Sequence, residues 1–289
     1  NQVVLIDYTI IILGGKTMRN SKTNELVLTG LFTAIIIIMA FTPLGYIPLV
    51  VINATIIHIP VILGSLFCGP KKGAFLGFVF GFTSCLKATI VGGTLSSFVF
   101  SPVLAASLVG TSGIFKSLFI AFVPRILVGV IPYFVYIGIK KVLASEKKNL
   151  WGTVLNVLMS VFLAFGVYAF LGKMSESLSQ AAALGIGIAV GAVVFIVVEA
   201  VFIRKSTQVI PFVYAGVAGA MTNTLLVMGS IFVLYKDAYA DAIGVAGNAV
   251  LGVITGVISF NGVIEAIVAA IIVYLVGLVL NTIKPIAAK

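Results

Sequence analysis

Eight long apolar segments dominate the sequence and leave few ways for the chain to fold. A helix needs roughly 20 apolar residues to cross a bilayer, and each segment reaches or approaches that length, whereas the strands of a membrane barrel alternate over about 10. Only 9% of the 289 residues are charged, against about 25% in an ordinary soluble domain. The sequence therefore predicts an all-α integral membrane protein with eight spans and excludes a soluble or disordered chain. The segments cover residues 26–48, 52–69, 73–92, 113–139, 150–171, 180–203, 207–235 and 260–283.

The basic residues predict how these segments are oriented. Most of the 18 Lys and Arg residues lie before the first segment, in every second loop and after the last segment. Because Lys and Arg favour the cytoplasmic side, this distribution places both termini in the cytoplasm of a multi-pass protein, here in a prokaryotic cell membrane. The net charge of +10 is therefore explained by loops that face the cytoplasm. A nucleic-acid site would need the basic residues on one face of a folded domain, so no nucleic-acid partner is expected.

The first seventeen residues do not fit this pattern. Residues 3–13 are apolar but too short to span a bilayer, and Asp7 interrupts them. Met18, followed by Arg19, resembles a natural start. We expect residues 1–17 to be a non-native or upstream extension, with a short N-terminal helix as the alternative, and residues 18–289 to form a single transmembrane domain.

Two of the loops predicted to face outward are long. Residues 93–112 and 236–259 are too apolar to be simple solvated loops. We expect them to lie at the membrane interface or to fold back as lids over an outward pocket.

Small residues recur four positions apart in three of the segments. Such ridges let helix backbones approach closely in lipid, either within one chain or against a partner subunit. The first segment is the best candidate for a partner surface, because its other faces are rich in Ile and Leu and suit lipid. The ridges consist of Gly30 and Ala34, of Gly73, Gly77 and Gly81, and of Ala183, Gly187 and Gly191.

Seven polar residues inside or beside the apolar segments are the candidate substrate-binding residues. Ionisable groups in a membrane cost several kcal/mol and usually face a cavity or a partner. The predicted topology puts most of them at similar depths in the outer half, which indicates a polar pocket open to the outside. Lys87 can instead reach the interface, His58 can be a hydrogen-bonded core residue, and Arg125 can belong to a buried ion pair. The candidates are Asn53, His58, Lys87, Arg125, Asn223, Asn261 and Glu265.

No catalytic, metal-binding or nucleotide-binding set is found in the sequence. Gly15, Lys16 and Thr17 imitate the end of a P-loop, but the position five residues before Gly15 is not glycine. We therefore expect no enzyme, cofactor or metal, and any ATP hydrolysis must occur in another subunit. A proton-coupled secondary transporter of a small organic anion, with His58 and Glu265 relaying protons, is the alternative. It predicts an inverted internal repeat, which the sequence does not show.

Five stretches resemble the substrate-binding S-component of energy-coupling factor (ECF) vitamin transporters. They are LVLTGLFTAIIIIMAFTPLGYIPL (26–49), NATIIHIPVILGSLFCGPKKGAFLGFVFGFTS (53–84), FVPRILVGVIPYFVYIGIKK (122–141), AGAMTNTLLVMGSIFVLY (218–235) and GVISFNGVIEAIVAAII (256–272). The resemblance implies a membrane subunit that captures a vitamin from outside, docks on a transmembrane coupling subunit with two ATPases, and topples to release its substrate. In that family, small residues on the first helix contact the coupling subunit, and Gly30 and Ala34 match them here.

The family usually has six spanning helices, so residues 150–203 are interpreted as an inserted helical hairpin in an S-component-like bundle. Among the members of the family, the sequence looks closest to those for pantothenate, with hydroxymethylpyrimidine or riboflavin as alternatives. Charge supports a substrate with a carboxylate, because Lys87 and Arg125 outnumber the one acid, Glu265, in the outer half. An arginine offers a planar two-point match to such a group.

Overall fold

The computed structural model describes residues 21–48, 53–92, 94–174, 178–200, 209–283 and 286. The extension predicted for residues 1–17 lies outside this part. Seven helical stretches within it are long and apolar enough to cross a membrane, which confirms a helical membrane protein and matches every predicted segment except the second. These stretches are Thr23–Phe41, Pro70–Ile90, Ser112–Leu143, Lys148–Gly172, Gln180–Val198, Ile210–Ile243 and Val250–Thr282.

The second predicted segment is not one long helix. It contains strand β2 (Asn53–Thr55), which pairs antiparallel with β1 (Tyr46–Pro48), and then helix α3 (His58–Cys68). The 11 residues of α3 give a length of about 16 Å at 1.5 Å per residue, well short of the roughly 30 Å of hydrocarbon in a bilayer. Every residue from His58 to Phe67 is buried, so α3 lies inside the protein rather than against lipid.

Helix α4 (Pro70–Ile90) packs tightly along α6 (Ser112–Val128). A break at Gly129 and Val130 separates α6 from α7 (Ile131–Leu143). The single helix predicted over 113–139 is therefore two helices. A Cβ atom at Gly73, Gly77 or Gly81 would collide with the backbone carbonyl oxygen of Gly129, Arg125 or Ala121, respectively. This ridge serves packing within the chain, which was one of the two predicted roles.

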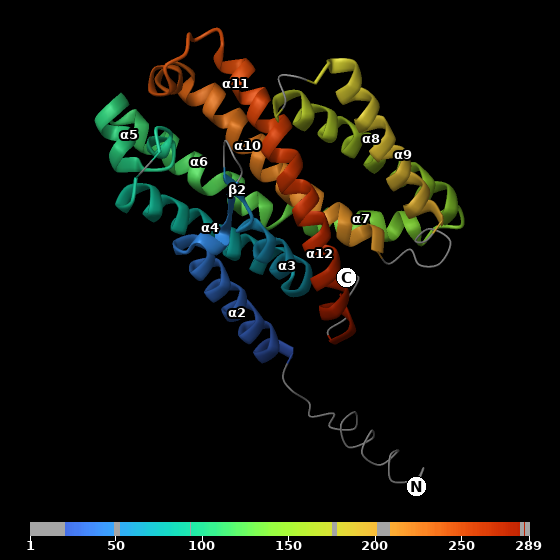
Figure 1. Ribbon diagram of the computed structural model, residues 1–289. Helices are drawn as coiled ribbons and strands as arrows, with labels where there is room; N and C mark the ends of the chain where they lie inside the picture. Colours follow the sequence, from blue (N-terminus) through green and yellow to red (C-terminus); the bar gives the residue numbers. More distant parts are fainter. Residues whose placement is uncertain are drawn as a thin grey trace.

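Helices α8 (Lys148–Met174) and α9 (Gln180–Val198) form a hairpin, and its interpretation as an insertion stays a prediction. Gly187 and Gly191 pack on Ala164 and on the carbonyl oxygen of Ser160, so the two helices run antiparallel in close contact. The hairpin lies on the opposite side of the bundle from α4 and α5 (Figure 1).

The C-terminal part of the chain is a long helical pair. Helix α10 (Val209–Ile243) has a kink at Tyr235, and it is followed by α11 (Val250–Val257), the π-helical turn η4 (Ile258–Gly262) and α12 (Val263–Ile283). Gly216 of α10 packs on the backbone of Ala269, so α10 and α12 approach each other closely. The start of α2 (Ser21–Phe41) and the end of α12 lie at the same end of the molecule (Figure 1).

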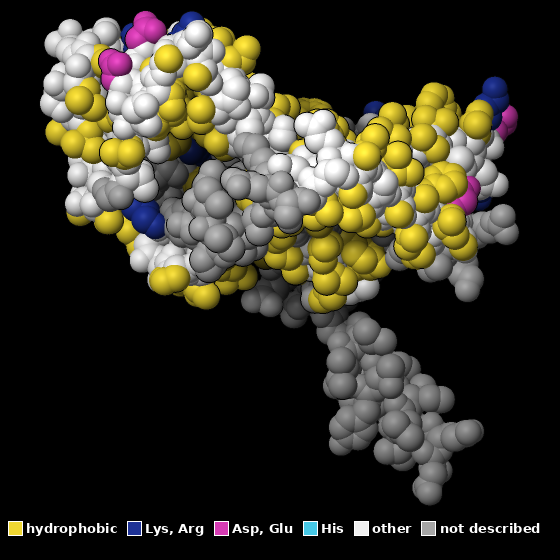
Figure 2. Space-filling view, turned by 45° about the horizontal axis from the view of Figure 1, so that its top comes forward, with side chains coloured by type: hydrophobic (Ala, Val, Ile, Leu, Met, Phe, Trp, Pro, Cys, Tyr) yellow, Lys and Arg dark blue, Asp and Glu magenta, His cyan; other side chains and the backbone are white. Residues whose placement is uncertain are grey.

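Three hydrophobic cores hold the bundle together. The largest core joins α2, α3, α4, α7, α10 and α12, and a second core lies where the chain forms η2 (Ser97–Val99), α5 (Pro102–Val109) and α11. A third, small core consists of Leu143, Leu155 and Ile210. The two long loops predicted at 93–112 and 236–259 are largely helical and contribute to this second core. Phe98 meets Tyr235 edge to face there, with ring centroids 5.3 Å apart. Figure 2 shows one face of the molecule, on which hydrophobic side chains gather in patches and charged side chains are few, as expected for contact with a bilayer.

Candidate functional site

Glu265 connects three separate parts of the chain. It lies in the first turn of α12 and is only 5% exposed. Its Oε1 accepts a hydrogen bond from the backbone N–H of Thr55 in β2, and its Oε2 accepts one from the hydroxyl of Thr224 in α10, both at 2.8 Å. A buried carboxylate needs such donors to offset its lost hydration. Glu265 therefore fixes the β1–β2 hairpin and two long helices at one point.

His58 and Asn223 lie at the same depth on facing helices. Gly219 of α10 packs against the side chain of Ile62 in α3, and the two helices run in opposite directions. His58 is one turn before Ile62, and Asn223 is one turn after Gly219, so both positions fall at the level of Thr224 and Glu265. His58 is fully buried, and Asn223 is 8% exposed.

Asn261 belongs to the π-helical turn η4, directly before α12. Asn261 is 6% exposed and precedes Glu265 by four residues, so the two side chains share a helix face. The next residue, Gly262, packs against the side chain of Thr224, where an added Cβ would come within 3.0 Å. Turns of this kind occur frequently at functional sites.

Arg125 lies near the end of α6 and is 6% exposed. Its Nη1 donates to the carbonyl oxygen of Ile120 at 2.6 Å, and its guanidinium packs over the rings of Phe100 and Phe80, with centroids 4.7 and 5.5 Å from Cζ. Its charge also acts on the Glu265 carboxylate. The two aromatic faces and the carbonyl oxygen of Ile120 stabilise this desolvated cation inside the bundle.

Three of these buried residues have polar atoms without a hydrogen-bond partner in the described part of the chain. They are Nδ1 and Nε2 of His58, Oδ1 of Asn223 and Oδ1 of Asn261. A buried polar group that lacks a partner costs about 1–3 kcal/mol. The cluster of His58, Arg125, Asn223, Asn261 and Glu265, called the polar cluster below, thus has the hydrogen-bonding capacity to hold a small polar ligand.

The other predicted residues lie elsewhere. Asn53 is in β2, two residues before Thr55 and so beside the polar cluster. Nζ of Lys87 donates to the carbonyl oxygen of Ala40 at 3.0 Å and links α4 to the end of α2. Gly30 and Ala34 lie on the exposed face of α2, which contributes nothing to the polar cluster.

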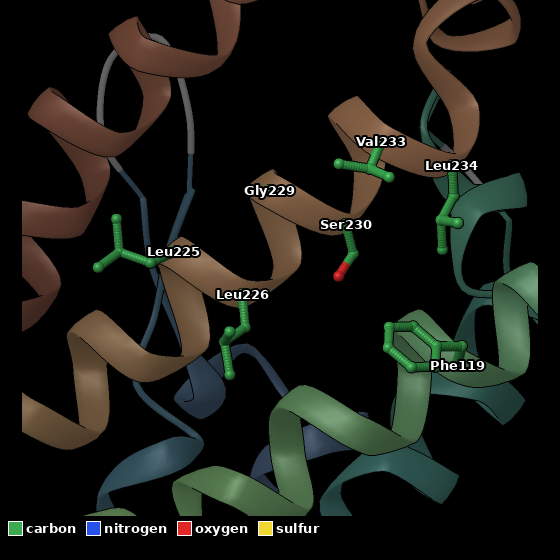
Figure 3. A pocket seen from close by; sticks show the side chains of 7 residues that line it. All are labelled: Phe119, Leu225, Leu226, Gly229, Ser230, Val233 and Leu234. Carbon is green, nitrogen blue, oxygen red and sulfur yellow. The ribbon is translucent and has the colours of Figure 1, made fainter.

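An apolar groove of about 300 Å³ opens between α6 and α10 (Figure 3). The only polar side chain among its lining residues is that of Ser230, and none of the predicted binding residues lines it. The polar cluster itself is closed, as the low exposure of its members shows. The groove is lined by Phe119, Leu225, Leu226, Gly229, Ser230, Val233 and Leu234.

Sequence reasoning missed several residues that complete the cluster. Thr224 could have been found, because Thr222, Asn223 and Thr224 form a polar triplet in an apolar helix. The backbone N–H of Thr55 carries no sequence signal. Phe80 and Phe100 could not be singled out either, since aromatic residues are common in apolar segments.

Comparison with known proteins identifies the family. The family of substrate-specific components of ECF transporters matches residues 24–203. The pantothenic acid transporter PanT of Lactococcus lactis is 42% identical over 161 residues, which cover 52% of this chain and 78% of the relative. The pantothenate transporter PanT of Leuconostoc mesenteroides is 27% identical over 277 residues, or 94% of this chain and 98% of the relative. The match over more than half of the sequence and the helical membrane fold agree with the resemblance found in the sequence, and the chain belongs to the substrate-specific components of ECF transporters.

Proposed function

We propose that this chain is the substrate-capturing subunit of an ATP-driven ECF importer and that its substrate is pantothenate. The observation that carries the proposal is the polar cluster, which combines a buried arginine with amide and imidazole groups that lack partners. Two relatives named as transporters of pantothenate support the choice of vitamin.

The chemistry of pantothenate matches the cluster group by group. Its carboxylate takes two hydrogen bonds from the planar guanidinium of Arg125. Its amide and hydroxyl groups meet Asn223, Asn261 and His58, whose polar atoms then gain partners. Glu265 holds the surrounding elements in place through Thr55 and Thr224.

Entry of the substrate requires that the β1–β2 hairpin moves. The hydrogen bond from Thr55 to Glu265 holds this hairpin against α12 and closes the polar cluster. Opening of the cluster therefore requires this hydrogen bond to break.

Transport depends on partner subunits in this proposal. The chain crosses the membrane eight times with both termini in the cytoplasm, and α3 completes the second pass inside the protein. The exposed face of α2 docks on a transmembrane coupling subunit through Gly30 and Ala34, and two ATPase subunits supply the energy. An added Cβ at Gly30 would meet no atom within 4 Å, which leaves room for another helix backbone.

Two measurements test this function. Mass spectrometry of the detergent-solubilised chain is expected to find pantothenate as the copurified vitamin, whereas hydroxymethylpyrimidine or riboflavin would overturn the assignment of substrate. In liposomes that contain only this chain, a proton gradient should drive no accumulation of pantothenate. Concentrative uptake there would favour a proton-coupled transporter that uses His58 and Glu265.

A further inference from the structure

Helix α8 packs directly against residues 260–265, the end of η4 and the start of α12, which carry two residues of the polar cluster. The ring of Phe170 in α8 stacks on that of Phe260 in η4, with centroids 5.0 Å apart and an angle of 10° between the planes. One turn earlier in α8, Gly166 lies against Val263, and an added Cβ would collide with Cγ1 of that valine. The two helices therefore run antiparallel with their side chains interlocked.

Residues 260–265 form one short helical segment. The residues that α8 contacts lie on one of its faces, and two residues of the polar cluster lie on another. Phe260 and Val263, three residues apart, face α8. Glu265 accepts hydrogen bonds from Thr55 of β2 and Thr224 of α10, and Asn261, four residues earlier, lies on the same helix face. Because all four belong to one rigid helical stretch, any rotation that moves Phe260 or Val263 also moves Asn261 and Glu265.

The π-helical turn makes this stretch dependent on its neighbours. A π-helical turn is wider than an α-helical one and is rare, so its geometry requires support from outside. Here Gly262 packs on Thr224 from one side, and Phe260 packs on Phe170 from the other. Phe260 and Val263 are 5% and 4% exposed, so neither has room to adjust independently.

We propose that α8 sets the rotation of η4 and thereby the affinity of the polar cluster for its substrate, with Gly166 and Phe170 as positioning residues. The inference rests on the proposed function, that is, on pantothenate binding at the polar cluster. It gives the α8–α9 hairpin a role in substrate recognition, although the hairpin contributes no side chain to the cluster.

A matched pair of glycine variants tests this inference. Gly166→Ala places a methyl group against Val263, whereas Gly172→Ala, on the same helix, meets no atom within 4 Å. In titration calorimetry with pantothenate, Gly166→Ala is expected to raise Kd by about tenfold or more, because binding sites tolerate displacements of only about 0.5 Å. Gly172→Ala should leave Kd unchanged. Val263→Ala removes the colliding methyl group, so the Gly166→Ala/Val263→Ala double variant should recover the affinity lost in Gly166→Ala.

Phe170→Leu with its control Phe165→Leu provides a second test. Phe170 stacks on Phe260, and Phe165 is 55% exposed on the same helix. We expect only Phe170→Leu to weaken pantothenate binding and to change the ratio of its Kd to that of pantothenol, the alcohol analogue. A lower melting temperature of the substrate-free protein with an unchanged Kd would show that α8 has only a structural role, which overturns the inference.

The proposed function and the inference fail in different ways. If the parent chain does not bind pantothenate, the proposed function is wrong, and the inference falls with it. If the parent chain binds pantothenate but Gly166→Ala and Phe170→Leu bind it as tightly as their controls, only the inference is overturned.

Discussion

The hydroxyl of Thr224 donates a hydrogen bond to Oε2 of Glu265 across a distance of 2.8 Å. The two residues are 41 positions apart in the sequence and belong to α10 and α12, and both are buried. A hydrogen bond to a charged group contributes about 1.5–3 kcal/mol. This contact therefore joins the two longest described helical stretches of the C-terminal part at the depth of the polar cluster.

Thr224→Val keeps the shape of the side chain and removes the donor. We expect the free energy of unfolding to fall by about 1–3 kcal/mol, because Oε2 of Glu265 stays buried without this partner. Thermal unfolding in detergent measures the change. Thr255→Val is the control, because Thr255 is exposed and its hydroxyl bonds only within its own helix. Equal melting temperatures for the two variants would contradict a supporting role for Thr224.

Gly77 and Gly30 should respond in opposite directions to replacement by alanine. A Cβ atom at Gly77 would collide with the backbone of Arg125, so Gly77→Ala is expected to cost about 1–3 kcal/mol of stability and to weaken pantothenate binding. Gly30 has open space around it, and Gly30→Ala should gain up to about 1 kcal/mol from the higher helix propensity of alanine. Thermal unfolding of both variants checks the signs, and destabilisation by Gly30→Ala would contradict the packing described for α2.

The sequence predicted the helical membrane class well because each apolar segment is locally defined by its length. The prediction of secondary structure was wrong where contacts between distant parts of the chain determine it. The segment 52–69 was expected to cross the membrane as one helix, but β1 pairs with β2 and leaves only α3 helical. The break after Val128 interrupts the segment predicted over 113–139, and α10 continues through a kink at Tyr235 beyond the end of the segment predicted over 207–235.

For the candidate site, the residue types carried most of the information. Polar residues are costly in a membrane, so His58, Arg125, Asn223, Asn261 and Glu265 could be selected without a structure. The fold brings His58, Asn223 and Glu265 to one depth, and their role in substrate binding stays a prediction. Their closure could not be predicted, since it depends on the backbone of Thr55 in a hairpin with no sequence signal. The residue type did not predict the position of Lys87, because its hydrogen bond to the end of α2 depends on where two helices meet.

The docking surface on α2 leads to a prediction about assembly. Gly30→Leu and Ala34→Leu should each prevent a helix of the coupling subunit from approaching closely, while pantothenate affinity stays unchanged. Copurification of the ATPase module, measured beside calorimetry, separates the two effects. Gly185→Leu is the control, because Gly185 is equally exposed and unobstructed but lies on α9. If the module copurifies as well with the α2 variants as with Gly185→Leu, α2 is not the docking face.

The central claim is that Arg125 binds the carboxylate of the vitamin, and titration calorimetry with pantothenate and pantothenol tests it most directly. Arg125→Lys should bind pantothenate more weakly by roughly tenfold to over a hundredfold, because one ammonium group cannot reproduce a two-point contact worth about 1.5–3 kcal/mol. The parent protein should bind pantothenol about as weakly as the variant binds pantothenate. If the parent protein binds pantothenate and pantothenol with equal affinity, Arg125 does not recognise a carboxylate and the account of the site is wrong.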